Sequence, residues 1–81
     1  MSVAELKSQI QARKFKAMEL AAEMDRRAKD IADLMSAYPL VRLKDLKFRL
    51  IASLAAESAK LQDEYLQIQK EIEAGEKELA G

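Results

Sequence analysis

The chain has 81 residues, 35% of them charged and 49% hydrophobic, and its 14 basic and 14 acidic side chains give a net charge of zero. This length allows one small domain, and the absence of Cys and His excludes disulfides, thiolate or histidine catalysis and zinc sites built on those ligands. No apolar run approaches the roughly 20 residues that cross a bilayer, and the first residues lack the pattern of a signal peptide. We therefore expect a cytoplasmic location.

A single proline, Pro39, lies near the middle of a chain dominated by Ala, Leu, Glu, Lys and Arg. Proline disfavours helical geometry in the residue before it but is accepted in a first helical turn. We therefore expect one domain over 1–81, with a helix over about 2–37, a turn at 38–39 and a second helix over about 39–78. The predicted fold class is all-α, an antiparallel two-helix hairpin of coiled-coil type. The alternative is one continuous helix kinked at Pro39, which would need other chains to bury its apolar stripe.

The first predicted helix opens with a capping box, Ser2 with Glu5, and a hydrophobic staple between Met1 and Leu6. Arg13 and Arg27 interrupt its apolar stripe, and we interpret them as register-setting residues whose stems lie along the seam while their guanidinium groups stay wet. The stripe repeats every seven residues at Val3, Ile10, Ala17, Met24, Ile31 and Tyr38, with Leu6, Leu20 and Leu34 at the partner positions.

The second predicted helix carries a similar stripe whose spacing slips near Glu57 and Ser58, which predicts a local stutter. Gly75 and the acidic residues after it predict fraying, because glycine weakens a helix and acids oppose its dipole at the carboxyl end. The stripe consists of Leu40, Leu43, Leu50, Leu54, Leu61, Tyr65, Ile68, Ile72 and Leu79.

Charge supports the hairpin, because a fold at 38–39 would oppose residues whose numbers sum to about 77. Segment 1–18 has four bases and one acid and would face segment 57–81, which has seven acids and three lysines. Segment 19–37 has five acids and three bases and would face segment 38–56, which has four bases and one acid. Pairs such as Asp33 with Lys44 and Asp30 with Lys47 would add only ~0–1 kcal/mol each, so they select the antiparallel register more than they stabilise it.

A second apolar row lies off the predicted seam and would be wet in a monomeric hairpin. Its large and small side chains are typical of helices that approach closely, so we predict a homodimer that forms a four-helix bundle. The predicted interface consists of Phe15, Met18, Ala22, Val41, Phe48, Ala52, Ala55 and Ala59. In this register Phe15, Met18 and Ala22 would lie level with Ala55 and Ala59. The alternative is that Phe15 and Phe48 are scattered exposed residues, which are common on soluble proteins.

Four bases, Arg42, Lys44, Lys47 and Arg49, surround Phe48 near the predicted start of the second helix. Such a cluster could bind phosphate, nucleic acid or an acidic protein surface. The zero net charge and the acids of the first helix favour a solvated, internally paired face, with nucleic-acid binding as the alternative. Because the helix faces mix both charges, we expect no membrane binding.

No set of residues suggests catalysis, a cofactor or a metal site, so we expect a protein that is not an enzyme. The leading hypothesis is a protein–protein interaction module, a self-associating hairpin that holds a helix of another protein and serves as an adaptor, small chaperone or regulator. The alternatives are a nucleic-acid-binding dimer that uses segment 42–49 and a structural assembly subunit.

Overall fold

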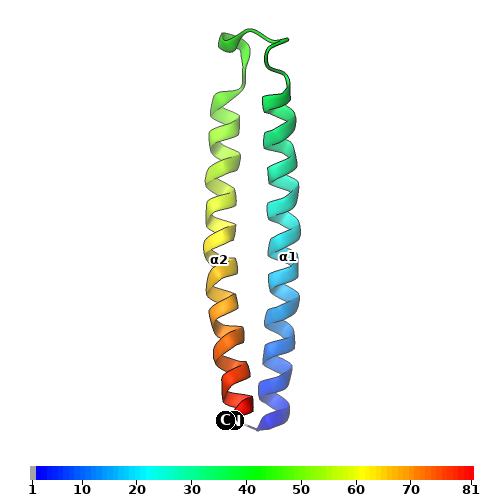
Figure 1. Ribbon diagram of the computed structural model, residues 1–81, viewed down its shortest axis with the longest axis vertical. Helices are drawn as coiled ribbons and strands as arrows, with labels where there is room; N and C mark the ends of the chain where they lie inside the picture. The colour runs from blue at the N-terminus through cyan, green and yellow to red at the C-terminus, as the bar shows by residue number, and fades with distance from the viewer. Residues whose placement is uncertain (1) are drawn as a thin grey trace.

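The computed structural model describes residues 2–81, which form two long helices that pack antiparallel. Helix α1 spans Val3–Ser36, α2 spans Phe48–Ala80, and a short 3-10 helix, η1, spans Leu43–Asp45 in the loop between them. The helices lie side by side along their whole length, with both termini at one end and the loop at the other (Figure 1). The resulting rod measures 60 × 14 × 14 Å. The predicted all-α hairpin is confirmed, and a continuous kinked helix is excluded.

The start of α1 shows the Ser2 half of the predicted capping box. Ser2 has extended backbone angles, φ −74° and ψ 158°, and its Oγ accepts a hydrogen bond of 3.1 Å from the backbone N–H of Glu5. This bond satisfies one of the amide groups that a helix leaves unpaired at its amino end. The Met1 half of the predicted staple lies outside the described residues.

The start of α2 differs from the prediction. Pro39 does not open this helix, which begins nine residues later at Phe48. The chain continues past α1 through a bond of 2.9 Å from the Val41 N–H to the Ala37 carbonyl, and then forms η1. The basic residues of segment 42–49 would oppose the dipole of a helix that started at Pro39, and extended angles at Leu46 separate η1 from α2.

The longer loop changes the register between the helices. Ion pairs join Arg13 to Glu71 and Arg27 to Glu57, and the two numbers in each pair sum to 84, against the predicted value of about 77. Each residue of α1 therefore lies opposite a residue of α2 that is seven positions later than the predicted one. The predicted pairs of Asp33 with Lys44 and Asp30 with Lys47 are wrong, because both lysines lie beyond or at the end of the paired helices.

The seam of α1 follows the predicted heptads, whereas α2 follows them without the predicted stutter. Its buried and half-buried positions alternate at spacings of three and four throughout the helix. Ile51, not Leu50, begins this series, and Ser58 takes a seam position where an apolar residue was expected. The α2 seam consists of Ile51, Leu54, Ser58, Leu61, Tyr65, Ile68, Ile72, Gly75 and Leu79.

The seam is better buried toward the termini than toward the loop. Leu6, Ile10, Ala17 and Ile72 form one buried cluster, with Tyr65, Ile68 and Leu79 packed against it. Near the loop, the seam side chains are only half-buried, namely Met24, Ile31 and Leu34 of α1 with Ile51 and Leu54 of α2. The half of the rod next to the loop therefore leaves part of its own core accessible.

Gly75 is buried at the seam and does not fray the helix, contrary to the prediction. A Cβ atom at this position would lie 2.9 Å from Cγ1 and 3.1 Å from Cδ1 of Ile10. Such distances are shorter than carbon atoms tolerate in packed interiors. Glycine at this position lets the two helices approach each other at the end of the rod that holds the termini.

Candidate interaction surfaces

The two sides of the seam differ in chemistry. Between the levels of Met18 and Met35, the residues that flank the seam are mostly small and apolar on one side, where Asp25 and Gln62 are the polar exceptions, and mostly charged on the other. Toward the termini the first side is polar as well, with Glu73 and an ion pair of 2.9 Å between Lys14 Nζ and Glu76 Oε1. We call the first side the alanine flank and the second the charged flank. The alanine flank consists of Met18, Ala21, Ala28, Ala32 and Met35 from α1 with Phe48, Ala52, Ala55, Ala59 and Leu66 from α2. The charged flank consists of Glu23, Arg26, Asp30 and Asp33 from α1 with Glu57 and Glu71 from α2.

Large side chains mark both ends of the alanine flank. In the observed register, Met18 lies level with Leu66, and these side chains are 69% and 52% exposed. Met35 lies level with Phe48 near the loop, and Phe48 is 51% exposed. The alanines lie between these two levels, which are about 27 Å apart at 1.5 Å per helical residue. The flank is thus a shallow trough with apolar walls at both ends.

The trough reaches the seam itself. A groove on this side is lined by Met24, Ala28 and Ile31 of α1 and by Ala55, Ser58, Ala59 and Gln62 of α2. A methyl side chain is too short to cover a neighbouring seam residue, so Met24 and Ile31 stay only half-buried. The alanine flank therefore exposes backbone and core together, as surfaces for close helix packing do.

On the charged flank, arginine side chains cover the seam at two levels, whereas near the loop a groove lined by Leu34, Leu50 and Leu54 leaves it accessible. Arg27 Nε lies 3.1 Å from Glu57 Oε2, and Arg27 Nη1 lies 3.8 Å from Glu23 Oε2. Arg13 Nε lies 3.5 Å from Glu71 Oε2 further along the same side. Both arginines are half-buried at seam positions, as the sequence predicts, with their charged groups directed to this flank.

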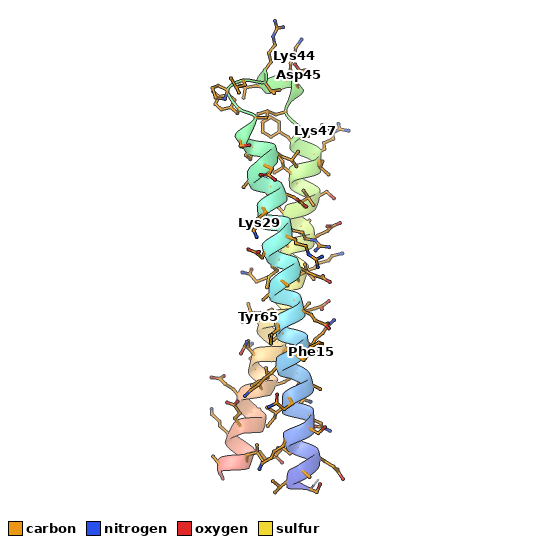
Figure 2. The ribbon with its side chains drawn as sticks, turned by 90° about the vertical axis from the view of Figure 1, so that its right-hand side faces the viewer. Phe15, Lys29, Lys44, Asp45, Lys47 and Tyr65 are labelled. Atoms are coloured by element: carbon orange, nitrogen blue, oxygen red, sulfur yellow. The ribbon has the colours of Figure 1, made fainter. Side chains whose placement is uncertain are left out.

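The predicted interface residues fall into three groups. Met18, Phe48, Ala52, Ala55 and Ala59 lie on the alanine flank, Phe15 and Ala22 occupy heptad positions on the outer side of α1, and Val41 is half-buried in the loop. In Figure 2, α1 faces the viewer and carries Phe15, which is 63% exposed, whereas Tyr65 belongs to α2 behind it. The sequence predicts that Met18 and Ala22 lie level with Ala55 and Ala59, and this is wrong. In the observed register, the two pairs are shifted relative to each other by about 10 Å along the rod.

The predicted basic residues gather at the loop end of the rod. Arg42 and Lys44 lie in the loop, Lys47 is the residue before α2, and Arg49 lies in its first turn. Lys44 and Asp45 lie at the far end of the molecule, with Lys47 closer to the helices (Figure 2). None of the ion pairs found among residues 2–81 includes any of these four bases. The acids of α1 do not neutralise this cluster, contrary to the expectation of internal pairing.

Apolar side chains accompany these bases at the loop end. Leu40 is 93% exposed and Leu43 is 59% exposed, while Tyr38 is about half exposed. Leu46, in contrast, is buried. We call the exposed set Tyr38, Leu40, Arg42, Leu43, Lys44 and Lys47 the tip.

Sequence reasoning missed the exposed leucines of the tip and five residues of the alanine flank, namely Ala21, Ala28, Ala32, Met35 and Leu66. A heptad count from the correct α2 seam would have found the flank, because Phe48, Ala55 and Ala52, Ala59, Leu66 each recur at seven-residue spacing. The leucines of the tip could not have been found in this way, since Leu40 and Leu43 have the spacing of seam residues.

No protein-family model, curated protein or solved structure matches the chain. Within residues 2–81, no helix is long and apolar enough to span a membrane. The same part of the chain contains no group of three or more carboxylates arranged to hold a metal ion. The surfaces of the hairpin are therefore the basis for a functional proposal.

Proposed function

We propose that the chain is a non-enzymatic, cytoplasmic protein–protein interaction module that self-associates through its alanine flank. Two hairpins would form a homodimeric four-helix bundle. The observation that supports this most is the groove in which Met24 and Ile31 stay half-buried behind Ala28, Ala55 and Ala59. An apolar helix face placed over this groove would complete their burial.

A second copy fits this flank by size and by chemistry. The alanines permit close approach of helix backbones, and the large side chains at the levels of Met18 and Phe48 would close both ends of the contact. A matching surface exists on every copy, as a two-fold interface requires. The charged flank would stay in water, because burying Asp30 or Asp33 without a cation costs free energy.

Self-association would also enlarge the small hydrophobic core of the isolated hairpin. Within residues 2–81, its buried hydrophobic side chains are only Leu6, Ile10, Ala17, Leu20, Leu46 and Ile72, and no large side chain is fully buried. Chains of this size commonly gain stability by oligomerising when two helices enclose too little apolar surface. A dimer would add the half-buried seam residues next to the loop to this core. The bundle would then present its ends and charged flanks to other proteins, in the role of an adaptor, chaperone or regulator.

The test is a pair of matched double variants examined by sedimentation equilibrium. Ala28→Glu with Ala55→Glu places two charges in the alanine flank and should reduce self-association at least 100-fold, because both carboxylates would be buried without partners. Ala22→Glu with Ala56→Glu makes the same chemical change on the outer sides of the helices and should leave association within about threefold of the wild type. Circular dichroism would verify that both variants stay helical.

Equal effects of the two double variants would contradict the proposal. If Ala22→Glu with Ala56→Glu disrupted the dimer instead, the interface would lie on the outer faces of the helices, which include Phe15 and Ala22 of the predicted interface. A wild type that stays monomeric but binds an amphipathic peptide in the alanine flank would assign the groove to a helix of another protein.

A further inference from the structure

The tip combines unpaired positive charge with aliphatic side chains that have no protein neighbours to cover them. Leu40 and Leu43 are 93% and 59% exposed, which is unusual for leucines in a loop that buries its neighbour Leu46. Arg42, Lys44 and Lys47 lie within a few residues of these leucines and form no ion pair in the described chain. The same few residues therefore offer both an apolar and a cationic contact.

We propose that the tip binds the surface of an anionic membrane. Leu40 and Leu43 would enter the region between headgroups and acyl chains, and the bases would lie at the level of the lipid phosphates and carboxylates. Cationic side chains beside an apolar insertion are the chemistry that such an interface recognises. The cytoplasmic leaflet, with its anionic lipids, supplies this surface inside a cell.

The leucines favour a membrane over nucleic acid as the partner. Nucleic acids bind basic side chains through their phosphates and stack their bases on aromatic side chains, as Tyr38 and Phe48 would allow. An aliphatic side chain adds little affinity for phosphates or for stacked bases. At the surface of an anionic bilayer, the leucines and the bases of the tip would both contribute to binding. The mixed charges of the helix faces disfavour binding of the helices lying flat on a membrane. The tip is separate from these faces, because it lies at the end of a 60 Å rod.

The position of the tip allows membrane binding together with self-association. The alanine flank runs along the side of the rod, whereas Lys44 and Asp45 lie at its end (Figure 2). Asp45 is the one acid in the segment 38–49, against four bases, so the end of the rod stays positively charged. Membrane binding thus needs no rearrangement of the helices.

Vesicle co-sedimentation of the full chain tests the proposal. We expect binding to vesicles made of equal parts phosphatidylserine and phosphatidylcholine at low salt, weaker binding at high salt, and none to phosphatidylcholine alone. Lys44→Gln with Lys47→Gln should lower the partition coefficient about 25-fold, since each base near an anionic surface contributes about fivefold. Leu40→Ser with Leu43→Ser should lower it about tenfold without changing the charge.

The matched control is Lys7→Gln with Lys60→Gln, which removes two exposed lysines far from the tip and should change the partition coefficient less than twofold. All these side chains are exposed, so helicity should be retained in each variant. Absence of wild-type binding to the anionic vesicles would overturn the proposal, as would an equal loss in the control. If the lysine variants lost binding and the leucine variants did not, the contact with the vesicles would be electrostatic alone, and the proposed insertion of Leu40 and Leu43 would be wrong.

Discussion

At the residue scale, Gly75 shows how one missing side chain sets the distance between the two helices. Glycine in a helix interior costs about 1 kcal/mol relative to alanine, so an alanine would be preferred if the site were open. The site is closed by Ile10, whose Cγ1 would lie 2.9 Å from an added Cβ. The local sequence predicts fraying at Gly75, and this prediction is wrong. The glycine is explained by Ile10, which lies 65 positions away in the sequence, on the other helix.

We expect Gly75→Ala to lower the free energy of unfolding by about 1 kcal/mol, because the strain of overpacking at Ile10 exceeds the gain in helix propensity. Urea denaturation at a fixed protein concentration measures this. In an Ile10→Ala background, the same substitution should raise the free energy of unfolding, since the clash is then removed. A gain of about 1 kcal/mol in the wild-type background would show that the helices do not approach closely at this level.

Ser58 is the polar residue in the otherwise apolar α2 seam, and its Oγ donates a hydrogen bond of 2.9 Å to the Leu54 carbonyl of its own helix. We expect Ser58→Leu to raise the free energy of unfolding by about 1 kcal/mol, because a half-buried seam position gains apolar burial. Ser53→Leu makes the same change on the exposed side of α2 and should have an effect below about 0.5 kcal/mol. Equal effects in thermal melts of the two variants would place Ser58 outside the seam.

At the element scale, α1 follows from its sequence because its signals are local. Ser2 supplies the cap, and the seven-residue repeat with Arg13 and Arg27 at its edge identifies the buried stripe. The start of α2 could not be found in this way. Leu40 and Leu43 keep the spacing of a seam, and Pro39 is acceptable at the start of a helix, yet the segment between the helices forms a loop around Leu46. The register depends on the length of this loop, so an error at one proline moved every predicted contact between the helices.

The loop offers a direct contrast between a buried and an exposed leucine. We expect Leu46→Ala to lower the free energy of unfolding by about 2 kcal/mol, because it removes a buried side chain and leaves a cavity. Leu40→Ala should change it by less than about 0.5 kcal/mol, since Leu40 contacts little of the protein. Both values come from urea denaturation at one protein concentration. A large effect at Leu40 with none at Leu46 would indicate a helix that starts near Pro39, as the sequence suggested.

At the scale of the whole molecule, the hairpin is a rod with three distinct surfaces. The charged flank covers the seam at two levels with arginine–glutamate pairs, the alanine flank leaves the seam accessible, and the tip presents bases and leucines at one end. Of these surface features, only the division into a seam and a second apolar row could be predicted from the sequence. The predicted charge pattern is confirmed near the termini, where Arg13 and Lys14 pair with Glu71 and Glu76. Near the loop it is wrong, because the observed register places the bases of the tip beyond the acids of α1.

If the alanine flank binds a second copy of the chain, the absolute mass in solution will be that of a dimer. Light scattering across a concentration series should give a mass twice the 9.1 kDa of one chain, falling toward 9.1 kDa only on dilution. The mass should not grow past the dimer, because a two-fold interface is closed. A mass of 9.1 kDa at every concentration would show that the alanine flank does not bind a second copy.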